Sequence, residues 1–133
     1  MESAYTLFTR GSELLESGDP AQAALLLEKA MEIEPDKASV REALGRAYFN
    51  HGQVHLAATH FRKTVSLQPS EDYAHYGLAL CYLRQDRPQR ALRHAKLAMA
   101  MRPGCDRYQR LLIRVDRMIK SEHRKLSTEY GPA

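Results

Sequence analysis

The apolar and small residues of this chain recur at a fixed step of 34 positions. Three prolines mark the step, at Pro35, Pro69 and Pro103. Self-similarity at a period of this size is the sequence signature of repeat architectures, in which one supersecondary unit is stacked several times. The same step superimposes three further sets of residues: Ala23, Ala57 and Ala91; Leu27, Phe61 and Ala95; and the pair Leu44 and Leu78.

Each 34-residue unit is predicted to form two helices joined by a turn. Turn signals divide the units at residues 18–20, 50–52 and 85–88. Asp19 followed by Pro20 supplies a capping oxygen and a first-turn proline, both typical of a helix start. Asp86 stands where the other units hold Gly18 and Gly52, and Asp tolerates left-handed backbone better than most residues. The prolines of the 34-residue step end each second helix, because proline disfavours helical backbone in the residue before it.

The units are predicted to span residues 4–37, 38–71 and 72–105. No helix pair can cover its own apolar faces, so the pairs must stack and the end of the stack needs a lid. Residues 106–125 supply one, because their apolar residues follow helical spacing and the others are mostly charged. Residues 126–133, which include Gly131 and Pro132, are expected to form a flexible tail. The apolar stripe of the lid consists of Leu111, Leu112, Val115, Met118 and Ile119.

The repeated unit resembles the tetratricopeptide repeat (TPR) family over residues 4–105. The tryptophan that opens the family pattern is absent, and Leu7, Arg41 and His75 stand in its place. The resemblance implies an all-α fold, a right-handed α-solenoid of three helix-turn-helix units with a capping helix, as a single domain over residues 4–125. It rests on Leu44-Gly45-x-x-Tyr48, Leu78-Ala79-x-x-Tyr82, Ala57-x-x-x-Phe61 and Ala91-x-x-x-Ala95-x-x-Ala98, closed by Pro69 and Pro103, and on a looser first unit with Gly11, Leu14, Ala23, Leu27, Ala30 and Pro35.

The resemblance also implies where a partner binds, because first helices of the family line a concave groove for an extended peptide or a helix. Carried over to this sequence, the groove is formed by Tyr5, Phe8, Ser12 and Leu15, then Ser39, Glu42, Arg46 and Phe49, then Tyr73, Tyr76, Leu80 and Leu83. The same spacing on the capping helix adds four arginines on one helical face, Arg107, Arg110, Arg114 and Arg117. The groove is expected to be aromatic at its beginning and middle and cationic at its far end.

Such a groove suits a partner segment that combines apolar side chains with an acidic portion. Tyrosine and phenylalanine bury large areas, and arginine pairs with carboxylates or phosphates. We therefore predict a non-enzymatic adaptor or scaffold that binds a protein or peptide. The other interpretation, in which the aromatics pack against an N-terminal segment and the arginines only solvate the cap, stays open.

The resemblance does not extend to the chaperone-binding members of the family. Those members hold the terminal carboxylates of a partner with lysine, asparagine and arginine side chains. A chaperone-tail clamp is therefore not expected here. The matching positions of this sequence hold Phe8, Ser12, Ala43, Tyr73 and Gly77.

Charge is unevenly distributed along the 133 residues, a length that suits one domain. Residues 1–42 carry nine Asp and Glu against four Lys and Arg, whereas residues 84–125 carry thirteen Lys and Arg against four Asp and Glu. The basic segment, residues 84–125, leaves open an alternative function as a nucleic-acid- or ribosome-associated factor. A base-reading motif is absent, and the acidic first third would repel a long polyanion. Head-to-tail self-association of the oppositely charged ends stays open as well.

The sequence predicts no enzyme, cofactor or metal site. Phosphate-binding glycine loops are absent, and the histidines at 51, 55 and 60 lack the spacing of metal ligands. Cys81 and Cys105 are too few for a disulfide framework, so reduced thiols and a cytoplasmic location are expected. No apolar run approaches the length of a membrane span, and the N-terminus lacks the layout of a secretory signal.

Overall fold

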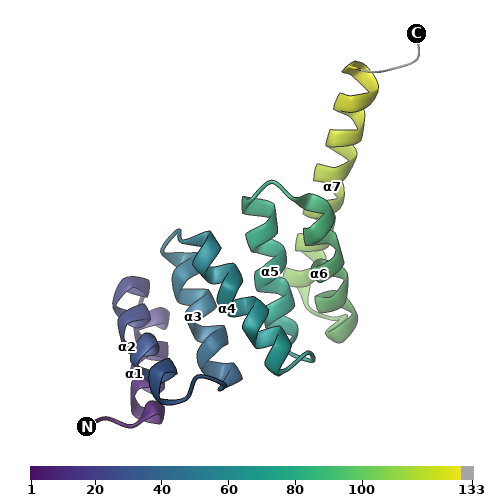
Figure 1. Ribbon diagram of the computed structural model, residues 1–133. Helices are drawn as coiled ribbons and strands as arrows, with labels where there is room; N and C mark the ends of the chain where they lie inside the picture. Colours follow the sequence, from purple (N-terminus) through teal and green to yellow (C-terminus); the bar gives the residue numbers. More distant parts are fainter. Residues whose placement is uncertain (130–133) are drawn as a thin grey trace.

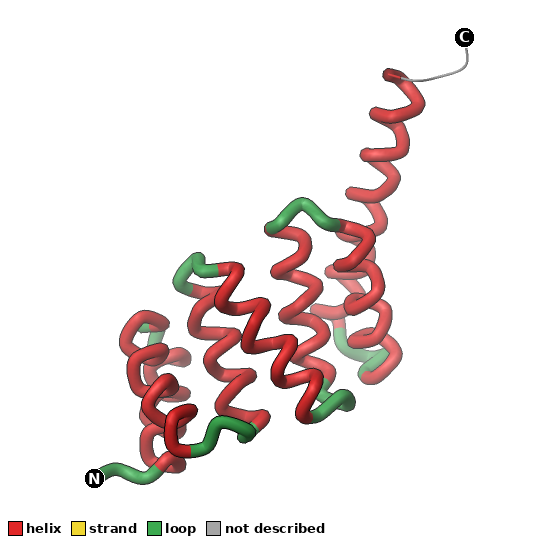
Figure 2. Tube along the Cα trace, in the orientation of Figure 1, coloured by secondary structure: helices red, strands yellow, loops and turns green. Residues whose placement is uncertain are grey.

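Residues 1–129 of the chain are described by the structure, a computed structural model, and this part contains seven helices and no strand. Three antiparallel hairpins follow one another in chain order, and the last helix covers the final hairpin (Figure 1). Short loops join all the helices (Figure 2). The expected all-α solenoid is confirmed. The helices are α1 (Ala4–Glu16), α2 (Pro20–Ile33), α3 (Ala38–Asn50), α4 (Val54–Leu67), α5 (Asp72–Arg84), α6 (Pro88–Met101) and α7 (Asp106–Glu129).

The turn inside each hairpin contains one residue with positive φ. Gly18 and Gly52 adopt φ values of 86° and 81°, and Asp86 adopts 58° at the same place in the third unit. Left-handed backbone is strained for residues with a Cβ atom, and aspartate is among the few that visit it. Asp19 then caps α2 by accepting a hydrogen bond from the backbone N–H of Gln22 at 3.2 Å.

The loop after each of the three hairpins contains an equivalent side-chain hydrogen bond. The carbonyl oxygen of each repeat proline accepts a hydrogen bond from the side chain six residues later. Arg41 donates to Pro35 at 2.8 Å, His75 to Pro69 at 3.0 Å, and Gln109 to Pro103 at 2.9 Å. Polar residues at this position therefore fasten each following first helix to the loop before it, and α7 keeps the same fastening.

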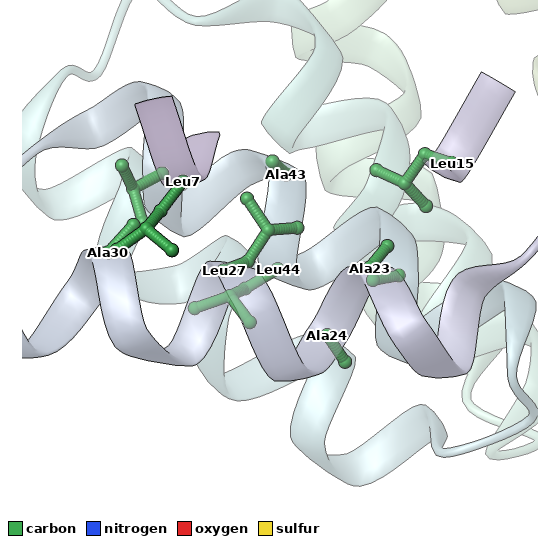
Figure 3. Packing of buried hydrophobic residues seen from close by; sticks show 10 residues of the cluster. Leu7, Leu15, Ala23, Ala24, Leu27, Ala30, Ala43 and Leu44 are labelled. Atoms are coloured by element: carbon green, nitrogen blue, oxygen red, sulfur yellow. The ribbon is translucent and has the colours of Figure 1, made fainter. Parts of the chain in front are cut away.

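Small residues let the two helices of a hairpin approach closely. A Cβ atom on Gly11 would lie 2.7 Å from Cγ of Leu27, which forms the centre of the first core cluster (Figure 3). The ring of Phe61 lies between two glycines, since Cβ atoms on Gly45 and Gly77 would approach it to 2.6 and 2.5 Å. Gly45 belongs to the same hairpin as Phe61, and Gly77 belongs to the next one. Phe61 therefore joins two units as well as two helices.

The last helix, α7, closes the core and continues past it. Leu111 and Val115 pack with Ala79 and Leu83 of α5 and with alanines of α6. The helix ends at Glu129, beyond residue 125, where we expected the flexible tail to begin. Residues 126–129 contain neither glycine nor proline, so nothing in them interrupts the helix. The rest of the expected tail, residues 130–133, lies outside the described residues. The outer half of α7 extends away from the hairpins (Figure 1).

Ile113 marks where α7 departs from the repeat. It occupies the position that Gly11, Gly45 and Ala79 hold in the preceding first helices. Those small residues face a second helix, whereas Ile113 is 53% exposed. The last helix thus corresponds to the first helix of a repeat unit. It carries a bulky residue at the position where the first helices of the three units pack against their second helices. Within residues 1–129, no helix combines the length and the apolar composition that crossing a bilayer requires.

Candidate functional site

The predicted site residues lie on the first helices α1, α3 and α5 and on α7, and we call them together the inner surface. Tyr5 is 77% exposed, and the four predicted arginines on α7 are exposed as well. The remaining predicted residues are half-buried, each with part of its side chain accessible. The inner surface consists of Tyr5, Phe8, Ser12, Glu42, Arg46, Phe49, Tyr73, Tyr76, Leu80, Arg107, Arg110, Arg114 and Arg117.

Two residues that the family pattern places in the groove are absent from this surface. Leu15 is only 8% exposed and Leu83 only 7%. Leu15 packs in the first core cluster and Leu83 in the third. Both stand at the last groove position of a first helix, where Phe49 of the second unit stays half-buried. These two leucines therefore stabilise the core and are not available to a partner.

The N-terminal end of the inner surface contains a hollow of about 280 Å³ between α1 and α3. Tyr5 and Phe8 form one side of it and Ser39 and Val40 the other. Because the hollow combines aromatic walls with an open mouth, it can accept an apolar side chain. Ala4, Glu34 and Lys37 complete the lining.

A row of tyrosines runs from the centre of the inner surface towards α7. The ring centroids of Tyr73 and Tyr76 lie 5.5 Å apart, and those of Tyr76 and Tyr108 lie 5.1 Å apart. Both pairs are tilted, the arrangement that the charge distribution of aromatic rings favours. The guanidinium groups of Arg46 and Arg107 stand over Tyr73 and Tyr76 at 5.5 and 5.9 Å. The row is thereby held in place between two cations.

Two acidic residues between α3 and α5, Glu42 and Asp72, carry less free negative charge than exposed carboxylates do. Burial raises the pKa of Glu42 to about 7, and the nearby carboxylates of Glu71 and Asp72 add to this effect while Arg46 opposes it. Asp72 accepts a hydrogen bond from the Tyr108 hydroxyl at 2.6 Å and pairs with Arg102 at 3.2 Å. The contacts of Asp72 and the raised pKa of Glu42 therefore reduce the free negative charge at the centre of the surface.

The cationic end consists of two adjoining hollows along α7. The first, about 300 Å³, lies between α5 and α7 and is lined by Tyr76, Leu80, Leu111 and three arginines. The second, about 550 Å³, lies further along α7 and is lined by Ile113, Met118 and Ser121 with three arginines. Arg110 and Arg114 line both hollows.

The four arginines that α7 contributes to the inner surface make no salt bridge within residues 1–129. The ion pairs of this part of the chain involve other cations, such as Arg102 with Asp72 and Lys120 with Asp116. Arg107 is engaged only by the ring of Tyr76. The positive charge of the stripe is therefore available to an anionic partner.

Sequence reasoning did not place Tyr108, Ile113 or Met118 in the site, and it assigned Met118 to the apolar stripe of the lid. Tyr108 stands at the repeat position of Val40 and Ala74, which are buried, so its position indicates a core residue. Its ring is indeed buried, but its length carries the hydroxyl to Asp72. Ile113 stands at a glycine or alanine position, and the residue change itself was the signal that sets this helix apart from the preceding first helices.

Three histidines and one cysteine, His60, His75, His94 and Cys81, lie between the helices. His60 packs between helices, where its ring stacks on Tyr48 at 5.5 Å. His75 and His94 stand with their Nδ1 atoms 3.1 Å apart, and burial together with the neighbouring His75 and Arg93 lowers the pKa of His94 to about 4. Burial raises the pKa of the Cys81 thiol to about 12, which makes it a poor nucleophile. These groups form the interior between helices and supply no reactive side chain to the surface.

Comparisons with known proteins identify the repeat. Two family models, both described as tetratricopeptide repeat, match residues 42–104 and 14–58. The sequence comparison with curated proteins found no match.

Solved structures with a similar fold are TPR domains. The first TPR of Spaghetti (RPAP3), bound to the HSP90 peptide SRMEEVD, superimposes with a TM-score of 0.85 at 16% identity over 89% of this chain and 94% of that one. The Sgt2 TPR domain from Aspergillus fumigatus superimposes with a TM-score of 0.85 at 20% identity, over 91% of this chain and 82% of that one. The second TPR domain of human RPAP3, in complex with the HSP70 peptide SGPTIEEVD, gives 0.79 at 14% identity, over 85% and 94%.

Proposed function

Because the chain belongs to the tetratricopeptide repeat family, a fold that generally serves as a protein-interaction module, we propose that it is a non-enzymatic adaptor whose inner surface binds a peptide or helix of a partner protein. Similar domains bind peptides, as the HSP90 and HSP70 complexes illustrate. Function on a repeat scaffold belongs to the particular surface, so the proposal rests on the side chains that this chain presents.

The observation that carries the proposal is the tyrosine row with unpaired arginines beside it. Tyr73 and Tyr76 offer broad, half-exposed rings whose positions are already fixed by Arg46, Arg107 and Tyr108. A partner that covers preorganised rings loses little side-chain entropy. Tyrosine and arginine are also the residue types most enriched at binding hot spots.

The mode of binding differs from capture of a chaperone tail. The positions that clamp terminal carboxylates in chaperone-binding relatives hold Phe8, Ser12, Ala43, Tyr73 and Gly77. Two of them have no room for a clamp residue, since Ala43 is buried and Gly77 lies directly against Phe61. We infer that the partner segment is recognised along its length, through apolar side chains and an acidic portion, and not by its terminal carboxylate.

The charge of the surface supports the acidic portion of this proposal. Asp72 is paired and the pKa of Glu42 is raised to about 7, whereas the arginines of the inner surface make no salt bridge within residues 1–129. Cationic side chains that face solvent without a carboxylate favour an anionic partner and reject a basic one. We also propose a cytoplasmic location, where the free thiols of Cys81 and Cys105 remain reduced.

Selection from a displayed library of random 16-residue peptides tests the proposal. Peptides enriched on the wild-type protein are synthesised with a fluorophore, and their Kd values are measured by fluorescence anisotropy. The double variant Tyr73→Ala/Tyr76→Ala removes two rings and is expected to weaken binding at least tenfold. The variant Leu56→Ala, which removes an exposed apolar side chain from α4, serves as the matched control and should bind as the wild type does.

Circular dichroism melting of each variant shows whether it is folded at the assay temperature. Peptides that bind the folded double variant as tightly as the wild type would place binding elsewhere and contradict the proposal. An absence of enriched peptides would contradict it as well.

A further inference from the structure

The two hollows along α7 adjoin each other, one at the inner surface and the other beyond it, and we call them together the track. They share Arg110 and Arg114 as a common wall. The first hollow adjoins α5 through Tyr76 and Leu80, and the second contains only residues of α7. The track therefore extends past the three repeats along the axis of the last helix.

The charge of the track is uniform. Arg107, Arg110, Arg114 and Arg117 line it, and no acidic residue lines either hollow. The acidic residues of the same helix that lie closest in sequence, Asp106 and Asp116, do not line it, and Asp116 pairs with Lys120 at 3.0 Å. A bound partner therefore contacts four guanidinium groups, and no carboxylate lining the track competes with it for them.

The floor of the track is apolar at both ends. Tyr76 and Leu80 stand in the first hollow, and Ile113 and Met118 stand in the second. Ile113 is the residue whose position faces a second helix in the three preceding units, so its exposed side chain has lost that partner. Apolar surface bordered by unpaired cations on a folded domain indicates a binding site for a partner that offers both complements.

We propose that this track binds an extended acidic segment in which apolar residues flank the carboxylates on both sides. One apolar side chain occupies the hollow beside Tyr76 and Leu80, the carboxylates pair with Arg110 and Arg114, and a second apolar side chain occupies the hollow beside Ile113 and Met118. The proposal rests on the proposed peptide-binding function and defines the partner's chemistry and its register at the C-terminal end of the site.

The length of the track sets the length of the segment. From residue 107 to residue 121 an α-helix rises about 21 Å. An extended chain advances about 3.3 Å per residue, so the track holds about six residues. The two apolar side chains of the partner are thus expected to stand about four to six positions apart, with acidic residues between them.

Peptides from the displayed 16-residue library provide the probe for this proposal. Their enriched sequences should contain one or more Asp or Glu between two apolar residues at that separation. The variant Arg110→Ala/Arg114→Ala should weaken binding at least tenfold and flatten its dependence on salt, since screened charge pairs have been removed. The matched control Arg90→Ala/Arg93→Ala, which removes two exposed arginines from α6, should leave the Kd unchanged.

A second variant tests the outer hollow alone. Ile113→Ser should weaken binding three- to tenfold, and replacing the second apolar residue of the peptide by alanine should abolish that difference. Since Ile113 is exposed, the substitution leaves the fold intact. A peptide whose affinity depends on Tyr73 and Tyr76 but not on Ile113 or the two arginines would overturn this inference and leave the proposed function standing. Peptides indifferent to the tyrosines would overturn the proposed function itself.

The same arginines could serve a nucleic acid, and the assay separates the two. A 20-nucleotide poly-U RNA is titrated in parallel at 150 mM salt. Weak or absent binding of the RNA, together with acidic enrichment among the peptides, supports the proposal. Tight RNA binding that Arg110→Ala/Arg114→Ala abolishes, with no acidic enrichment among the peptides, would assign the track to a polyanion and overturn it.

Discussion

The ring of Phe61 on α4 lies against the backbone of Gly77 on α5, so close that a Cβ atom at residue 77 would stand 2.5 Å from the ring. The contact crosses from the second hairpin to the third. Gly77→Ala is therefore expected to lower the free energy of unfolding by about 2 kcal/mol, although alanine is the better helix former by about 1 kcal/mol. Urea denaturation measures the change.

The matched control for this substitution is Gly104→Ala, because nothing lies within 4 Å of the added Cβ and the backbone there is not left-handed. It should change stability by less than about 0.5 kcal/mol. In the double variant Gly77→Ala/Phe61→Leu, the smaller side chain should recover part of the loss. Strict additivity of the two single changes would show that the glycine and the ring do not interact.

The histidine pair of the third hairpin makes stability depend on pH. The carbonyl of Pro69 can only accept, so His75 donates from Nε2 and its Nδ1 accepts from Nδ1–H of His94. The pKa of His94 is lowered to about 4, chiefly by burial. Between about pH 6.5 and 4 the unfolded chain binds a proton that native His94 does not. Stability from this group is therefore present above pH 6.5 and is lost as pH falls through that window.

The first hairpin supplies the matching variant, because Leu7 and Leu26 stand at the positions of His75 and His94. The double substitution His75→Leu/His94→Leu should reduce the loss of stability between pH 7 and pH 5 by about 1–2 kcal/mol. Thermal melting over this pH range checks it. Equal pH dependence in the variant and the wild type would contradict the assignment to this pair.

Glu42 makes the protein less stable as pH rises, which is opposite to the effect of His94. Its pKa is raised to about 7, first by burial and then by Glu71. Between about pH 4.5 and 7 native Glu42 keeps a proton that the unfolded chain has released, so stability falls as pH rises through this window. Glu42→Gln should stabilise the protein by about 1–2 kcal/mol at pH 8, after allowance for solvent screening, and by little at pH 5.

The exposed residue Glu32 of α2 provides the control for Glu42, since Glu32→Gln removes a carboxylate from the surface. It should leave the pH profile unchanged. A profile of Glu42→Gln that runs parallel to the wild type in urea titrations from pH 5 to 8 would show that Glu42 is ionised throughout.

Tyr108 fastens α7 to α5 through its hydroxyl. The hydrogen bond to the carboxylate of Asp72 is 2.6 Å long, and Asp72 also pairs with Arg102. Tyr108→Phe is expected to cost about 1–3 kcal/mol, because it leaves a half-buried carboxylate with one partner fewer. Hydrogen exchange should accelerate in α7 more than in α3. Tyr73→Phe, which removes a hydroxyl from the other end of the tyrosine row, should leave exchange in α7 as it is in the wild type.

The repeat could be predicted from the sequence because its causes are local. The prolines, the Gly18–Asp19–Pro20 turn and the small residues at Gly11 and Gly45 each act on neighbouring backbone or on the paired helix. Their 34-residue step therefore indicates the hairpins directly. Gly77 could not be interpreted in this way, since Thr9 and Ala43 hold its position in the other units. Its requirement arises from one ring in the preceding hairpin.

The candidate site could be predicted only in part, for a similar reason. Helical spacing indicates that four arginines of α7 share a face, but it does not indicate which cations form a salt bridge with a carboxylate. Arg102 pairs with Asp72, thirty positions earlier in the chain, while Arg110 and Arg114 find none within residues 1–129. The fates of Leu15 and Phe49 likewise depend on the neighbouring unit, because the same repeat position is buried in one and accessible in the other.

Ile113 gives the array a built-in stop. Each hairpin is closed by a helix that presses against glycine or alanine, and α7 offers a branched side chain at that spot instead. Adding a second helix that packs against α7 would consequently require replacing Ile113 by glycine or alanine. The same bulk leaves an exposed apolar side chain on α7, which is surface that the corresponding glycines and alanine of the three repeats do not provide.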